Sequence, residues 1–223
     1  MKTLHDKDID LALIQETKLS KETIIGYRVI RQDRETGRRG CRVEEEKTPG
    51  GGILILVKDG LPYIERKPHS RHPDDTTTEI QTVEVDIGGK KLRVTNVYIP
   101  PIRQCKGDQR EQKFEAEYLP WKYTDIIAGD MNAHAKEWDK TSSEDKMGRD
   151  IADCVENNRF NVLNNGQPTY LSRSHEVTST PDVTLAKNMR RATAEWRRLD
   201  HTGTENIPIN ITVKFGSQAK VVV

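Results

Sequence analysis

Several short apolar runs in the sequence begin or end at acidic, amide or phenolic side chains that a hydrophobic core does not need. The residues at these points are Glu16, Tyr98, Asp130, Asn132 and Asp182. Polar groups at the ends of buried strands gather on one rim of a sheet, so we expect these five side chains to form an oxygen-rich site. Oxygen ligands without cysteine favour Mg²⁺ or Mn²⁺ over zinc.

The apolar runs themselves predict a protein built mainly of strands. They are short and rich in isoleucine and valine, as strands are. Gly88 and Gly89 separate two alternating runs, which predicts a hairpin with a tight turn. The expected strands cover residues 11–14, 53–57, 80–87, 92–99, 126–128, 183–186 and 207–215.

Helical patterns are fewer. Residues 148–160 place Ile151, Val155 and Phe160 on one face and predict a helix, and residues 109–118 are a second candidate. The polar segments 31–49 and 66–78 are expected to be surface loops. We expect one domain over residues 1–215, followed by a frayed or truncated tail at 216–223.

Composition excludes several classes of protein. The chain has 223 residues, with 36 basic and 35 acidic side chains, and no run approaches the roughly 18 apolar residues of a membrane helix. The first thirty residues lack the apolar core of a signal peptide. Three widely spaced cysteines fit neither a disulfide framework nor a zinc site, so we expect a reducing intracellular compartment and no membrane association.

Four segments, in this order, resemble the endonuclease/exonuclease/phosphatase superfamily. They are Gln15-Glu16-Thr17, Asn96-Val97-Tyr98-Ile99-Pro100-Pro101, Gly129-Asp130-Met131-Asn132-Ala133-His134 and Pro181-Asp182. More narrowly, the chain is similar to the apurinic-endonuclease-like domain of LINE-type (non-LTR) retrotransposons. The features that point there are Trp138, Gly148 and the segment Asn164-Asn165-Gly166-Gln167-Pro168-Thr169.

The resemblance implies an α/β (α+β) fold, a four-layer αββα sandwich, and Mg²⁺-dependent (or Mn²⁺-dependent) cleavage of a phosphodiester bond. It assigns Glu16 to the metal and Tyr98 to the scissile phosphate or a developing oxyanion. Asp130 and Asn132 would position and activate the attacking water, and Asp182 would orient a histidine.

The sequence departs from the family pattern near its C-terminal end. The family reads Ser-Asp-His before x-Pro-Ile, whereas this chain has Thr204-Glu205-Asn206 before Ile207-Pro208-Ile209. We favour Glu205 as the second metal carboxylate and Asn206 at the histidine position. The competing alignment uses Asp200-His201, which contains the dipeptide but lies further from the next strand.

A second departure lies at the start. The family's first strand, which carries an asparagine near the metal, normally precedes the segment that matches residues 4–10. It is absent here, so either the chain is a fragment or the element is degenerate. Its loss would leave backbone groups of neighbouring strands unpaired, so we expect a compensating rearrangement or reduced stability.

Each candidate residue also has a structural interpretation. Glu16 could be a solvated carboxylate, Tyr98 a half-buried strand aromatic, and Asp130, Asn132 and Asp182 ordinary turn residues. His134 is expected to be structural or to face solvent. Basic clusters could hold a phosphate backbone or could be solvated faces, and the members we single out are Arg38, Arg39, Arg190 and Arg191.

The resemblance therefore implies an endonuclease that nicks target DNA in the nucleus, so that a reverse transcriptase domain of the same natural polyprotein can prime from the 3′ hydroxyl. The alternative is a catalytically degenerate member of the family that retains the fold and DNA binding, because Asn206 cannot act as a histidine does. A phosphatase acting on a small molecule is a third alternative.

Overall fold

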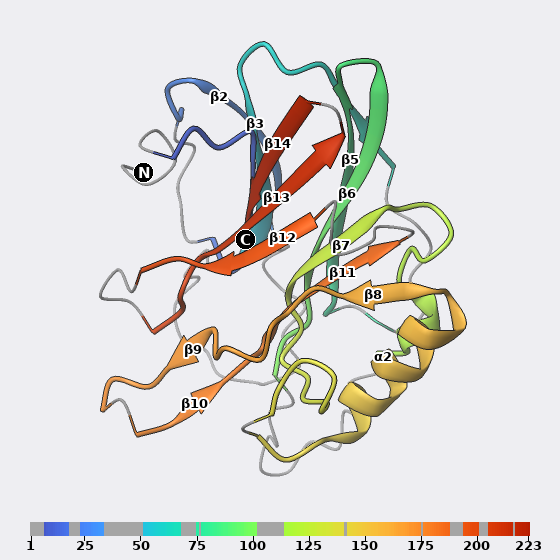
Figure 1. Cartoon of the computed structure of the whole chain (residues 1–223), viewed down its shortest axis with the longest axis vertical. Helices are drawn as coiled ribbons and strands as arrows, with labels where there is room; N and C mark the ends of the chain where they lie inside the picture. The colour runs from blue at the N-terminus through green and yellow to red at the C-terminus, as the bar shows by residue number, and fades with distance from the viewer. Residues whose placement is uncertain are drawn as a thin grey trace, which may run out of the picture.

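The structure is a computed structural model of residues 1–223 (Figure 1). The residues it describes are 7–17, 23–33, 51–67, 75, 77–101, 114–140, 142–174, 176–187, 194–200, 205–215 and 217–223.

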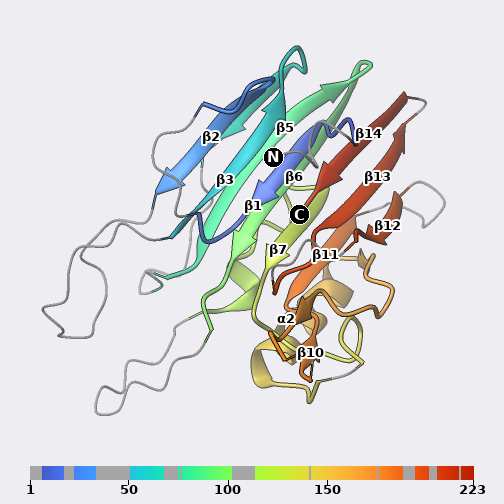
Figure 2. The same ribbon diagram turned by 90° about the vertical axis from the view of Figure 1, so that its left-hand side faces the viewer.

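Two six-stranded sheets lie face to face (Figure 2). Sheet A has the order β12-β13-β14-β1-β3-β2, and sheet B has the order β4-β5-β6-β7-β11-β8. The strands of sheet A are β1 (Leu11–Ile14), β2 (Tyr27–Asp33), β3 (Gly52–Lys58), β12 (Ala194–Arg198), β13 (Ile209–Phe215) and β14 (Ser217–Val222). Those of sheet B are β4 (Tyr63–Arg66), β5 (Glu79–Ile87), β6 (Lys90–Tyr98), β7 (Ile126–Asp130), β8 (Phe160–Val162) and β11 (Asp182–Lys187). A small separate hairpin pairs β9 (Tyr170–Leu171) with β10 (Thr178–Ser179).

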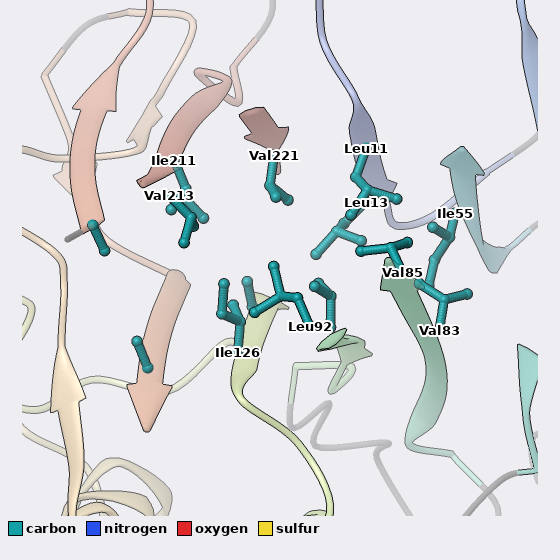
Figure 3. Close-up of a cluster of buried hydrophobic side chains, with 14 of the residues drawn as sticks. Leu11, Leu13, Ile55, Val83, Val85, Leu92, Ile126, Ile211, Val213 and Val221 are labelled. Carbon is teal, nitrogen blue, oxygen red and sulfur yellow. The ribbon is translucent and has the colours of Figure 1, made fainter. Parts of the chain in front are cut away.

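The main core lies between the two sheets. Alternate residues of each strand point inward, so Leu11 and Leu13 of sheet A meet Val83, Val85 and Ile126 of sheet B (Figure 3). Each of these side chains is at most 1% exposed. Burial on this scale, at about 25 cal/mol per Å² of apolar surface, holds the sheets together.

One α-helix, α2 (Lys146–Asn157), packs on the outer face of sheet B (Figure 1). Asp145 caps its start, because Asp145 Oδ1 accepts a hydrogen bond from Gly148 N at 2.6 Å. The helix begins and ends two to three residues before the predicted range of 148–160. Of the second predicted helix, 109–118, residues 109–113 lie outside the described residues, and Ala116–Tyr118 form a short 3₁₀ helix, η1.

These observations confirm the predicted sandwich of two sheets with few helices. All seven predicted strands are present, and the Gly88-Gly89 hairpin joins β5 to β6. The predicted loops at 31–49 and 66–78 begin too early in the sequence, because β2 extends to Asp33 and β4 includes Arg66. Within the described residues, no helix is long and apolar enough to cross a membrane.

The prediction of a frayed tail at 216–223 is wrong. Residues 217–222 form β14, which lies inside sheet A between β13 and β1 (Figure 2). Leu11 and Ala12 of β1 pair in parallel with Val221 and Val222. The edge of β1 that faces away from β3 is therefore paired with β14.

Candidate active site

The inter-sheet face changes from apolar to polar at one end of sheet B. Along β6 the inward positions are Leu92, Val94, Asn96 and Tyr98, so the strand that supplies the core also supplies two polar side chains. The same alternation leads along β7 to Asp130, the last residue of that strand.

Three of the predicted site residues lie side by side on adjacent strands. Tyr98 pairs with Asp130 across β6 and β7, and Asp130 pairs with Asp182 across β7 and β11. Residues that pair across strands point to the same face of a sheet. The structure therefore brings Tyr98, Asp130 and Asp182 together as the sequence predicted.

Glu16 joins this group from sheet A. The Tyr98 hydroxyl donates a hydrogen bond to Glu16 Oε1 at 2.5 Å. Glu16 is exposed and has a φ of 51°, a left-handed conformation that is unfavourable for a residue other than glycine. Tyr98 is only 2% exposed, so it is a buried residue bonded to the candidate metal ligand and not a half-buried aromatic with its hydroxyl in water.

A buried amide fixes the two sheets against each other beside the site. Gln15 Nε2 donates to Asn96 Oδ1 at 2.7 Å, and Asn96 Nδ2 donates to the carbonyl of Leu54 at 3.1 Å. Asn96 is fully buried, and these bonds link β6 of sheet B to the β1 end and β3 of sheet A. Asn96 thereby sets the separation of Tyr98 from Glu16.

Asp130 and Asp182 are two carboxylates in a site that water reaches poorly. Burial, followed by the nearby carboxylates of Asp182 and Glu16, raises the pKa of Asp130 to about 7. Burial also raises the pKa of Asp182 to about 6. Asp182 Oδ2 is buried and has no hydrogen-bond partner within the described residues. Such a pair requires a bound proton or a cation.

Asn132 is held in a strained turn next to Asp130. Its backbone N–H donates to Asp130 Oδ1 at 3.1 Å, and its Nδ2 donates to the carbonyl of Ile99 at 2.9 Å. Its φ of 46° is again left-handed. The turn interpretation is therefore correct, and the turn places this amide beside Asp130, while the catalytic role of Asn132 stays a prediction.

Glu205 and Asn206 lie next to the site on the far side of Thr169. Ile207 N donates to the carbonyl of Thr169, whose hydroxyl accepts a 3.4 Å bond from Asp182 N. The Glu205 carboxylate is 3.4 Å from the exposed Arg173 guanidinium. The metal role of Glu205 and the catalytic role of Asn206 stay predictions.

Each remaining candidate residue either has a hydrogen-bond or ion-pair partner or lies outside the described residues. Arg38, Arg39, Arg190, Arg191 and His201 lie outside the described residues. Two arginines near these positions in the sequence have acidic partners. Arg31 pairs with Asp33, and Arg197 lies 3.3 Å from Glu195. The His134 ring bonds a buried carboxylate, Asp139, at 3.0 Å, which agrees with the structural interpretation of this residue.

Sequence reasoning missed Asn164 as a support of the site. Its Nδ2 donates to the carbonyl of Asp182 at 2.9 Å, and its Oδ1 accepts from Thr184 N at 2.8 Å. This buried amide holds the start of β11 in place. The signal was present in the segment 164–169, which the family resemblance singles out, but the partner of Asn164 is 18 residues away.

The site fits a hard divalent cation in its chemistry. Glu16, Asp130 and Asp182 offer only oxygen ligands, and the orphaned Asp182 Oδ2 together with the raised pKa values shows that the pair lacks positive charge. Within the described ranges, however, no group of three or more histidine, cysteine, aspartate or glutamate side chains is placed so that it could hold a metal ion.

A sandwich of two mixed sheets with acidic, amide and tyrosine side chains at one strand rim is the endonuclease/exonuclease/phosphatase fold. Residues 92–205, just over half of the chain, match the endonuclease-reverse transcriptase family of this fold, and the chain belongs to that family. This finding confirms the resemblance to the superfamily and its LINE-type endonucleases. No curated protein sequence matches the chain.

Solved structures show the same fold at low sequence identity. The endonuclease domain of TRAS1, a telomere-specific non-LTR retrotransposon, is 18% identical with a TM-score of 0.66, over 97% of this chain and 91% of that one. An endonuclease/exonuclease/phosphatase family protein from Leptotrichia buccalis is 10% identical with a TM-score of 0.58, over 96% and 90%. TDP2 from D. rerio, complexed with a single-strand DNA product, is 11% identical with a TM-score of 0.52, over 92% and 84%.

Proposed function

We propose that this chain is a divalent-metal-dependent endonuclease that hydrolyses phosphodiester bonds of DNA. The observation that carries the proposal is the buried pair Asp130 and Asp182 beside the Tyr98–Glu16 hydrogen bond. Family membership supports nuclease chemistry. The TRAS1 structure is the endonuclease domain of a retrotransposon and the TDP2 structure contains a single-strand DNA product, and both support DNA as the substrate.

Glu16 would hold a Mg²⁺ or Mn²⁺ ion, with Glu205 as the second carboxylate, and the ion would neutralise charge that develops on the phosphate. Asp130 and Asn132 position the attacking water. A carboxylate with a pKa of about 7 can accept a proton from that water near neutral pH. The water oxygen then forms a bond to phosphorus as the bond from phosphorus to the 3′ oxygen breaks, which leaves a 5′ phosphate on one side and, after the 3′ oxygen takes up a proton from solvent, a 3′ hydroxyl on the other.

Tyr98 acts on the phosphate through its hydroxyl. In the structure this hydroxyl donates to Glu16, so the two groups move together and a phosphate bound beside Glu16 lies within reach of Tyr98. Asp182 orients the group on its other side, which in this chain is Asn206 in place of a histidine. A preorganised donor of this kind is worth on the order of 10²- to 10³-fold in rate.

A natural polyprotein would carry the reverse transcriptase that extends the nicked strand, and the enzyme would act on chromosomal DNA in the nucleus. The basic residues Arg38, Arg39, Arg190 and Arg191 would hold the DNA backbone.

Plasmid nicking tests the proposal. The full chain is incubated with supercoiled plasmid in Mg²⁺, Mn²⁺ or EDTA, and open-circle product is measured. We expect nicking with either metal and none in EDTA. Equal nicking in EDTA would contradict metal dependence.

The second candidate is a catalytically degenerate domain that binds DNA. Asn206 favours it, because an amide cannot carry a proton as a histidine does. A folded chain that binds DNA without nicking it, and that gains nicking on Asn206→His, would establish this alternative.

A further inference from the structure

His134 and Asp139 form a histidine–carboxylate pair that the proposed mechanism does not use. His134 Nδ1 lies 3.0 Å from Asp139 Oδ2, and the Asp139 side chain is fully buried. A buried carboxylate accepts the Nδ1 proton, so the other ring nitrogen, Nε2, points away from Asp139. The His134 side chain is 28% exposed, and within the described residues its Nε2 has no hydrogen-bond partner.

The backbone of His134 is also fixed. His134 N donates to Asp145 Oδ2 at 3.2 Å, and its carbonyl accepts from Asp145 N at 3.0 Å. Gly148 of α2 packs against the same carbonyl so closely that a Cβ there would lie 2.0 Å from it. Both the ring and the backbone of a partly exposed histidine are therefore held in one position, which a solvated surface residue does not require.

Asp139 ties this histidine to the acidic pair. Asp139 Oδ2 also accepts from Thr180 N at 3.0 Å, two residues before Asp182. Met131 N donates to the carbonyl of Pro181 at 2.9 Å, one residue after Asp130. The loop that carries His134 and the loop that carries Asp182 are thus bonded twice, at the end of sheet B where β7 finishes (Figure 1).

We propose that His134 Nε2 binds a phosphate of the DNA strand next to the scissile bond, with Asp139 as the residue that positions the ring. The inference rests on the proposed function for the identity of the ligand. In this contact Nδ1 donates a hydrogen bond to the Asp139 carboxylate, and Nε2 donates one to the phosphate. Hydrogen bonds to anionic acceptors are shorter and stronger than neutral ones. The contact supplies a histidine to a site that has an asparagine, Asn206, at the family's histidine position.

Two substitutions of His134 distinguish the role of Nε2, which faces away from Asp139, from the role of Nδ1, which bonds Asp139. In His134→Asn the amide nitrogen takes the place of Nδ1, so the bond to Asp139 is kept and the outward donor is lost. In His134→Gln the amide nitrogen takes the place of Nε2, so the outward donor is kept. Both variants are measured as full chains, with thermal unfolding as a control for folding.

The test measures binding to a short fluorescent DNA duplex in EDTA, at fixed salt, by anisotropy. Phosphates around the nick position are replaced one at a time by uncharged methylphosphonates. We expect His134→Asn to weaken binding about tenfold and His134→Gln to weaken it less. At one phosphate position, we expect the methylphosphonate to weaken DNA binding by the wild type about tenfold and to leave DNA binding by His134→Asn unchanged.

Absence of that coupling at every phosphate overturns the inference, whatever the variants do to stability, and so does absence of DNA binding by the wild type. Nicking in Mg²⁺ is scored separately. Coupling without nicking supports the His134 contact and contradicts the endonuclease proposal. Nicking without coupling supports the endonuclease and overturns the contact.

Discussion

Asp130 and Asp182 lie directly opposite each other on the antiparallel strands β7 and β11. Asp182 is 9% exposed, and its Oδ2 has no partner within the described residues. Two carboxylates in this arrangement repel each other, and the core that fills the rest of the sandwich provides no counter-charge. The pair therefore makes this end of the protein depend on pH and on cations.

Without metal, the protein should lose stability as pH rises. The pKa of Asp130 is about 7 and that of Asp182 about 6, both above the value near 3.9 of an unfolded chain. The folded state then binds more protons than the unfolded state between these values, so the free energy of unfolding falls from about pH 4 to about pH 7. In EDTA we expect a loss of roughly 4 kcal/mol between pH 5 and pH 8, measured by urea unfolding.

The matched variant for this effect is Asp130→Asn, which keeps the shape of the side chain and removes its charge. It should flatten the pH profile and be more stable than the wild type at pH 8. A wild type whose stability does not fall over the same range would show that folding does not raise the pKa values of the pair.

Divalent cations should reverse the loss. Mg²⁺ that binds only the folded state stabilises it by mass action. We expect the melting temperature at pH 8 to rise by several degrees in millimolar Mg²⁺ for the wild type, and to rise much less for Asp182→Asn. Potassium chloride at matched ionic strength is the control, and an equal rise in both salts would show screening in place of a bound ion.

The hydroxyl of Tyr98 should matter for rate more than for stability. Tyr98→Phe removes the hydrogen bond to Glu16 and keeps the buried ring. We expect kcat for nicking to fall roughly 10- to 100-fold while the affinity for DNA in EDTA changes little. Unchanged kcat would remove Tyr98 from the mechanism.

Gly129 is required by the contact between β6 and β7. Its φ is 149°, and a Cβ there would lie 1.9 Å from the carbonyl oxygen of Val97. Gly129→Ala should lower the free energy of unfolding by about 3 kcal/mol, since backbone must move. Gly89→Ala is the control, because Gly89 also has a positive φ but has no atom within 4 Å of an added Cβ. A similar cost at both positions would trace the effect to φ alone.

The sequence predicted the buried strands because their apolar runs are long enough to be seen without their partners. The strands it missed include β2, β4 and β12, and each of these is an edge strand of its sheet. Edge strands carry exposed charged residues, as in the segment Tyr27–Asp33, and a charged segment resembles a loop in sequence. β14 was missed for another reason, because its position beside β1 depends on strand pairing over 210 residues of sequence.

The acidic rim was predictable, since Asp130 and Tyr98 continue the alternation of the core. The bonds that support it were not. Asn164 reaches Asp182, and Asp139 reaches both His134 and Thr180, through contacts that depend on where loops fold back.

The most direct test of the central claim is the rate of plasmid nicking in Mg²⁺ by three proteins. These are the wild type, Asp130→Asn, and Asp153→Asn as a control for an exposed aspartate on α2. We expect the wild type and Asp153→Asn to nick plasmid at equal rates, and we expect the nicking rate of Asp130→Asn to be lower by at least about 10²-fold. Equal nicking by all three proteins would contradict this expectation, because the activity would then lie outside the site built around Asp130.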